Sequence, residues 1–142
     1  MKVLFDTNVI LDVLLDRSSF SEDAAFLVSK VEAGEIGGYL CATTITTIHY
    51  LATKSIGTKA AQQAIASLLS LFEVAPVTRA VLDDALKSGF GDFEDAVLYQ
   101  AACHAGADGI VTRNQQDFSK ITLALYSPKE LAQAITKIST AS

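Results

Sequence analysis

The sequence lacks the long apolar run that marks a membrane protein. Apolar residues make up 50% of its 142 residues, yet no stretch of them approaches the ~18 residues of a bilayer span. The opening residues do not predict a secretory signal either, because Asp6 interrupts the short apolar stretch near the start. We therefore expect a cytoplasmic protein with no membrane partner.

Cysteine is also scarce. Cys41 and Cys103 are the two cysteines of the chain, and they lie far apart inside apolar stretches. This spacing is not typical of a metal site, whereas a small buried side chain in a reducing compartment explains both residues.

The chain has no excess of positive charge. Its formal net charge is −5, and a protein that binds nucleic acid through its overall charge is usually basic. Any contact with nucleic acid must therefore depend on a local site, where metal cations supply the positive charge.

Repeats, low-complexity segments and long linkers are missing as well, so the sequence predicts a single domain over residues 1–142. Patterns typical of strands alternate with patterns typical of helices. This alternation predicts an α/β fold in which helices cover both faces of a parallel sheet. The predicted strands are 2–5, 39–42, 72–77, 109–112 and 123–125.

The predicted helices rest on apolar spacing and on residues that begin or end helices. Ser19 and Glu22 have the spacing of a capping box, Thr78 is a favourable N-cap, and 127–130 is a strong helix start. Segment 43–54 is harder to assign, because its threonines favour a strand while its apolar residues have helical spacing. We predict helices at 9–15, 19–33, 43–54, 58–71, 78–87, 92–104 and from 127 onward.

Acidic residues lie where an α/β sheet binds its ligands, beyond the carboxyl ends of its strands. Asp6 ends the first strand, and Asp117 lies a few residues after the fourth. Asp92, Glu94 and Asp95 form the first turn of a helix, where Asp92 and Asp95 share one face.

Each of these acids also has a purely structural explanation. Asp6 is suited to cap the first helix, the acids at 92–95 suit the positive end of a helix dipole, and Asp117 resembles an ordinary loop aspartate. Together, however, they would repel one another in one crevice unless a cation lay between them. Mg²⁺ binds carboxylate and phosphate oxygens and activates water for displacement at phosphorus. The set therefore predicts metal-dependent phosphodiester hydrolysis.

Three motifs resemble the PIN-domain family, in order over almost the whole chain: DTN at 6–8, DFED at 92–95 and TRNQQDF at 112–118. The resemblance implies a three-layer α/β/α sandwich around a parallel sheet of about five strands. It also implies a ribonuclease dependent on Mg²⁺ or Mn²⁺. Many small bacterial and archaeal members are toxins of toxin–antitoxin pairs and are commonly homodimers, so RNA, an antitoxin and a second copy of the chain are the expected partners.

The resemblance also assigns roles to residues. Asp6, Asp95 and Asp117 are expected to be the catalytic, metal-binding acids, and Asp92 an auxiliary metal ligand. The residues expected to orient these carboxylates or the waters on the metal are Asn8, Thr112 and Asn114.

Three further residues lie near this predicted site. Asp12 is one turn after Asn8, and we expect it on a solvated helix face although it could line the same crevice. Arg113 and Lys120 flank the site and are candidates for contacts with RNA phosphates.

The sequence departs from the family at one position. PIN domains usually carry a glutamate on the helix after the second strand, and the alignment places Thr47 there. No Asp or Glu occurs from 36 to 72, and a hydroxyl is a poor substitute for a carboxylate ligand. Asp92 or Glu94 could compensate, whereas His49 is expected to be a packing or surface residue. This departure leaves open a catalytically weakened module that binds RNA or a partner protein.

An unrelated α/β protein is the third alternative. Receiver domains and aspartyl-phosphate phosphatases also place an aspartate after the first strand. A receiver would need an acidic pair there and a lysine after a late strand, and a phosphatase would need a second aspartate where Asn8 stands. The nuclease interpretation is preferred.

Overall fold

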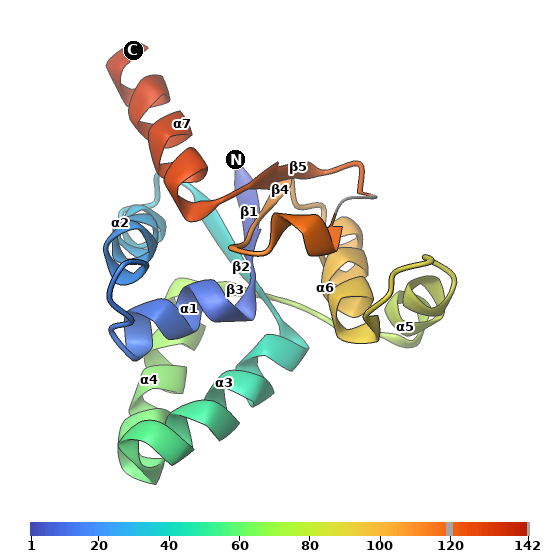
Figure 1. The fold of residues 1–142 in the computed structure, drawn as a ribbon, viewed down its shortest axis with the longest axis horizontal. Coiled ribbons are helices and arrows are strands. Elements are labelled where there is room, and N and C mark those ends of the chain that lie inside the picture. The colour runs from blue at the N-terminus through green and yellow to red at the C-terminus, as the bar shows by residue number, and fades with distance from the viewer. Residues whose placement is uncertain (119–120, 142) are drawn as a thin grey trace.

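The computed structural model describes residues 1–118 and 121–141, without the side chains of 139–141. The described strands form one parallel sheet in the order β3-β2-β1-β4-β5 (Figure 1). The predicted sandwich with about five parallel strands is confirmed. The strands are β1 (Lys2–Phe5), β2 (Gly37–Cys41), β3 (Glu73–Ala75), β4 (Gly109–Val111) and β5 (Ala124–Tyr126).

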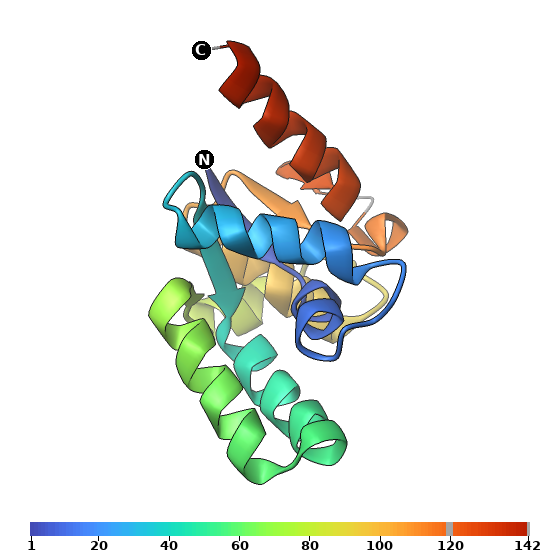
Figure 2. The ribbon, with the colours of Figure 1, turned by 90° about the vertical axis from the view of Figure 1, so that its left-hand side faces the viewer.

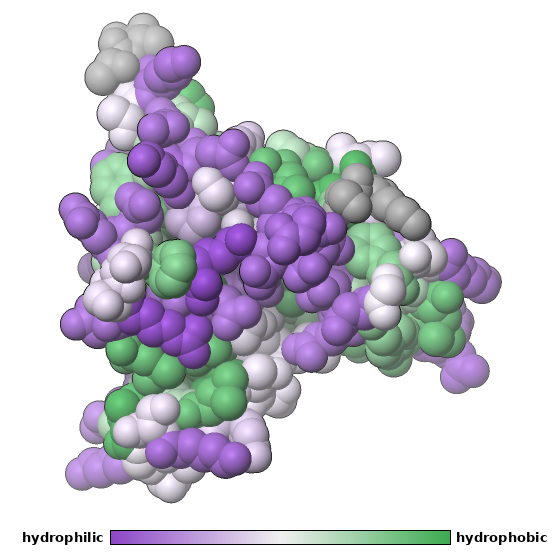
Figure 3. Space-filling model, viewed as in Figure 1, coloured by the Kyte–Doolittle hydropathy of each residue, from purple (hydrophilic) through white to green (hydrophobic). Residues whose placement is uncertain are grey.

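Helices connect the strands and cover both faces of the sheet. Figures 1 and 2 show α3 and α4 extending from one end of the molecule as a pair, while α7 extends from the opposite end. Figure 3 shows hydrophilic side chains across the middle of the face seen in Figure 1. The helices are α1 (Thr7–Leu14), α2 (Ser21–Glu32), α3 (Ala42–Ile56), α4 (Thr58–Leu71), α5 (Arg79–Leu86), α6 (Phe93–His104), the 3₁₀ turn η1 (Gln115–Phe118) and α7 (Pro128–Ala141).

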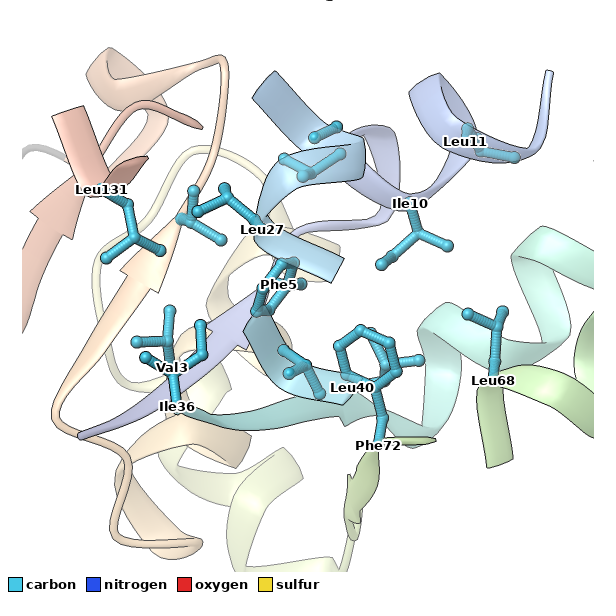
Figure 4. Packing of buried hydrophobic residues seen from close by; sticks show 14 of the residues in the cluster. Val3, Phe5, Ile10, Leu11, Leu27, Ile36, Leu40, Leu68, Phe72 and Leu131 are labelled. Atoms are coloured by element: carbon cyan, nitrogen blue, oxygen red, sulfur yellow. The ribbon is translucent and has the colours of Figure 1, made fainter. Parts of the chain in front are cut away.

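The side chains of β1 alternate between two apolar cores, as a strand buried on both faces requires. Val3 and Phe5 pack on the face covered by α1, α2, α3, α4 and α7, and Figure 4 shows this cluster around them. Leu4 packs on the opposite face, against residues of α5 and α6. Phe5 also meets Phe72 edge-on, with 5.2 Å between ring centroids. The first strand therefore forms the centre of the molecule.

The order in which the chain adds strands to the sheet reverses at β1. The chain first moves outward through β2 and β3 and then returns to place β4 and β5 on the other side of β1. In such sheets, ligands bind outside the carboxyl ends of the strands at this change of direction. Phe5 pairs with Val111, so Asp6 and Thr112 leave the sheet side by side.

Most predicted helix starts are confirmed. Thr78 caps α5, because its side chain accepts a hydrogen bond from the amide of Val81. At the start of α7, the Ser127 amide donates to Glu130 Oε1 (2.8 Å) and the Glu130 amide donates to Ser127 Oγ (3.1 Å). The segment that was hard to assign is helix α3.

One predicted cap is wrong. Helix α2 begins at Ser21, Phe20 occupies the N-cap position without a side-chain hydrogen bond, and Ser19 has a φ of 79° in the preceding loop. Of the two cysteines, Cys41 is buried and Cys103 is half-buried. No helix in the described part of the chain is long and apolar enough to cross a bilayer.

Candidate active site

Asp6 lies at the carboxyl end of β1 and is 7% exposed. It is the N-cap residue of α1, and its Oδ1 accepts a hydrogen bond from the Thr7 amide (2.8 Å). Its Oδ2 accepts a second bond from the hydroxyl of Thr112 (2.7 Å), a fully buried residue. Asp6 is therefore a helix cap, and the same contacts fix the orientation of its carboxylate at the edge of the sheet.

The predicted site residues come together. A cleft of about 330 Å³ is lined by residues from α1 and the end of β1, from α3, from the start of α6 and from the segment after β4. Thr112 lies behind Asp6 and does not line this cleft. The predicted residues that do line it are Asp6, Asn8, Thr47, Asp92, Glu94, Asp95, Asn114 and Asp117.

The acids repel one another. Burial, followed by the charges of Asp92 and Asp6, raises the pKa of Asp95 to about 7. Burial also raises the pKa of Asp6, against the opposing effect of its hydrogen bonds from Thr112 and Thr7. The charge of Asp117 acts in the same direction on both pKa values. The cleft therefore holds more negative charge than the protein neutralises.

This donor set suits a hard divalent cation, because carboxylate and amide oxygens are the ligands such ions prefer. A cation would also relieve the repulsion that raises the pKa of Asp95. In residues 1–118 and 121–141, however, no three His, Cys, Asp or Glu side chains lie close enough together to hold an ion as they stand. The residues fit the ion by chemistry and location, and the structure gives no coordination geometry.

Asp92 has a structural role at the same time. It is the N-cap residue of α6, and its Oδ1 accepts a hydrogen bond from the Asp95 amide (3.0 Å). Asp92 therefore stabilises the start of α6, and it also lines the cleft.

Comparison with known proteins gives the family. The sequence model of the PIN domain family matches residues 2–116 of this chain. The chain belongs to the PIN domain family. No curated protein matches it by sequence.

Several solved structures share the fold of this PIN domain. DNA-bound VapBC from Salmonella typhimurium has a TM-score of 0.68 at 15% identity, covering 90% of this chain and 98% of its own. FitAcB from Neisseria gonorrhoeae also has a TM-score of 0.68, at 19% identity, and the match covers 89% of this chain and 98% of its own. The sarcin–ricin loop cleaving toxin VapC20 from Mycobacterium tuberculosis has 0.65, at 14% identity, covering 84% and 96%. The family assignment excludes the receiver and phosphatase alternatives.

The α3 wall of the cleft carries hydroxyl groups. Thr47 is half-buried and lines the cleft, and Thr44 is fully buried with its hydroxyl 2.9 Å from that of Thr7. His49 is half-buried and is not among the residues that line the cleft. Helix α3 therefore contributes Thr47 and Leu51 to the lining of the cleft, and neither is an acid.

The expectation for Asp12 is wrong. We expected a solvated helix face, yet Asp12 is fully buried. Its Oδ2 accepts a hydrogen bond from Arg113 Nε (2.7 Å) and its Oδ1 one from Arg113 Nη2 (3.2 Å). Arg17 Nη1 lies 3.5 Å from the same Oδ1. The residues of α1 just before it, 9–11, are apolar and buried, so the carboxylate depends on these arginines.

The guanidinium of Arg113 is engaged by neighbouring residues of the protein. It binds Asp12 and lies over the ring of Phe20, with 4.0 Å between Arg113 Cζ and the ring centroid. The predicted contact between Arg113 and RNA phosphates stays a prediction, because these contacts use Nε and Nη2 and leave the side chain 23% exposed. We made the same prediction for Lys120, which lies outside the described residues. A lone acid within the apolar run of 9–15 was the sequence signal for a buried ion pair.

Proposed function

We propose that this PIN domain is a ribonuclease that hydrolyses RNA phosphodiester bonds with Mg²⁺ or Mn²⁺, and that it is the toxin of a toxin–antitoxin pair. One observation carries the nuclease proposal. Acids from three segments far apart in sequence line one cleft, and their mutual repulsion contributes to the high pKa of Asp95. A divalent cation between them would neutralise this charge.

In this proposal Asp6, Asp95 and Asp117 hold the ion, with Asp92 as an auxiliary ligand. The ion would supply an activated water and would stabilise charge on the phosphate oxygens. Thr112 keeps the carboxylate of Asp6 oriented through its 2.7 Å hydrogen bond, as supporting groups around metal ligands generally do.

The remaining supporting residues are assigned by location. Asn8 and Asn114 line the cleft, where their amides would orient ligands or waters. Asp95 would lose its proton when the ion binds, because the proton and the cation compete for the same carboxylate.

The proposed substrate and partners follow from similar structures. VapC20 is described as cleaving the sarcin–ricin loop, which supports RNA as substrate. A solved toxin–antitoxin complex from Klebsiella pneumoniae, with a TM-score of 0.66 at 21% identity, supports an antitoxin partner. A small protein encoded beside this chain should block its nuclease activity, and failure of every such neighbour to do so would contradict the toxin assignment. A homodimer stays a prediction, which sedimentation analysis would test.

The direct test is cleavage of RNA in the presence of Mn²⁺. Wild type should cleave, and Asp6→Asn and Asp95→Asn should each lower the rate by about 100-fold or more, because each removes a carboxylate that would hold the ion acting at the reacting phosphate. Asp83→Asn is the control, since Asp83 is an exposed acid of α5 away from the cleft. Equal cleavage by wild type, Asp6→Asn and Asp95→Asn would remove the assignment.

The second candidate is a catalytically weakened PIN module that binds RNA or a partner protein. The observation that favours it is that Thr47 of α3 lines the cleft with a hydroxyl. The resemblance to the family implies a glutamate at this position. Absence of Mn²⁺ binding to wild type at millimolar concentration would favour this candidate over the nuclease.

A further inference from the structure

A buried ion pair joins the first helix to the segment that follows β4. Asp12 is fully buried, and Arg113 donates to both of its carboxylate oxygens from 101 positions away. Neither residue lines the acidic cleft. A paired, buried carboxylate so close to the site, yet outside it, calls for a role of its own.

Arg113 stands in the middle of a connected turn. Before it, the Thr112 hydroxyl donates to Asp6 Oδ2 (2.7 Å). After it, the Asn114 amide donates to Thr112 Oγ1 (3.0 Å) and the Asp117 amide donates to the Asn114 carbonyl oxygen (3.0 Å). Fixing Arg113 therefore fixes the residues that orient Asp6 and carry Asp117.

We propose that Asp12 is a positioning residue, which holds the 112–117 turn through Arg113. It thereby keeps Thr112 in place to orient Asp6 and keeps Asp117 in place to bind the metal. The proposal rests on the nuclease function for the metal. Two parallel bonds from a guanidinium to a carboxylate fix direction as well as distance. A single ammonium group at the same place would supply the charge without the direction.

The loop between α1 and α2 closes around the same pair. Its Phe20 ring lies 4.0 Å from Arg113 Cζ, and the Arg17 amide donates to the Asp12 carbonyl oxygen (3.0 Å). Asp16 and Ser19 have φ values of 45° and 79°, conformations that L-residues adopt only when their surroundings enforce them. The loop is therefore part of the same assembly.

The experiment compares wild type with Asp12→Asn and Arg113→Lys. Hydrogen exchange of the 113–118 peptide and Mn²⁺ affinity by calorimetry are measured at a temperature where every variant is folded. Asp12→Asn keeps the size and removes the charge, whereas Arg113→Lys keeps the charge and removes the paired geometry. Glu35→Gln is the control, because it alters an exposed ion pair with Lys30 (2.8 Å) away from the turn.

Both variants should exchange faster than wild type in 113–118 while the peptides of β2 and β3 keep their protection. Their Mn²⁺ affinity should fall about 10- to 100-fold, as it does when groups that support metal ligands are lost. Glu35→Gln should match wild type in both measurements. Arg113→Lys also decides the question if Asp12→Asn fails to fold.

Two results would overturn the proposal. One is wild-type exchange and wild-type Mn²⁺ affinity in both variants. The other is faster exchange everywhere with unchanged Mn²⁺ affinity, which describes a residue that only stabilises the fold. If wild type binds no Mn²⁺, the metal-dependent function fails separately, and exchange of 113–118 still decides whether Asp12 holds the turn.

Discussion

Asp95 shows how the site makes the fold sensitive to pH. An aspartate in an unfolded chain titrates near ~3.9, whereas burial and neighbouring acids raise the pKa of Asp95 to about 7 in the folded protein. Between these values the folded state binds more protons than the unfolded state. The free energy of unfolding therefore decreases as pH rises from about 4 to about 7, and the loss is complete above that range.

Asp95→Asn should remove this penalty. Without metal, the variant is expected to have a higher Tm than wild type at pH 8. The difference should shrink as the pH falls and vanish below about pH 3, where Asp95 is protonated in both states of the wild type. Thermal unfolding in a chelating buffer measures it, with Asp83→Asn as control. If Asp95→Asn has the same Tm as wild type at pH 8, the raised pKa has no energetic consequence.

The residues of the site were predictable to different degrees. Position suggests that Asp6, Asp95 and Asp117 converge, because Asp6 ends a strand, Asp95 lies at the start of a helix and Asp117 comes a few residues after a strand; their roles as metal ligands come from the family resemblance. The pairing of Asp12 with Arg113 could not be predicted in the same way, because a helical pattern gives no information on a partner 101 positions away.

At the scale of elements, the spacing of apolar residues along the sequence predicts most of the helices and strands. Helix α3 forms despite its threonines, and one of them, Thr44, satisfies its buried hydroxyl through Thr7. The capping box at Ser19 does not form, and Phe20, which takes the N-cap position of α2, lies with its ring over Arg113. Local signals were sufficient except where distant segments meet.

Helix α3 offers a direct test of whether Thr47 belongs to the proposed metal site. Thr47→Glu should strengthen Mn²⁺ binding about tenfold, because an added carboxylate ligand increases the affinity of an oxygen site. Thr46→Glu is the matched control, since Thr46 is exposed on the same helix and does not line the cleft. Calorimetric titration compares the two, and equal affinities would show that Thr47 does not belong to the metal site.

Strand β4 requires a glycine where β5 approaches it. A Cβ atom on Gly109 would lie 2.9 Å from the Ala124 carbonyl oxygen and 3.1 Å from the Tyr126 ring. Gly109→Ala should therefore lower the free energy of unfolding by about 1–3 kcal/mol. Gly91→Ala, where no atom lies within 4 Å of the added Cβ, is the control in denaturant unfolding. Equal stability of the two variants would contradict the close approach.

At the scale of the whole molecule, the strand order brings the site together. Because β1 and β4 are neighbours at the change of direction, Asp6 and Thr112 meet although 106 positions separate them. The same arrangement concentrates acidic side chains in a chain whose net charge is already −5. An anionic substrate would approach this cleft favourably only with cations bound there.

The most direct test of the account is calorimetric titration of Mn²⁺ into wild type, Asp6→Asn, Asp95→Asn, Asp117→Asn and the control Asp83→Asn. The account predicts that wild type and Asp83→Asn bind the ion alike, and that each of the three cleft variants binds it at least about tenfold more weakly. Equal affinity in all five proteins, or no binding by wild type, would contradict a shared metal site.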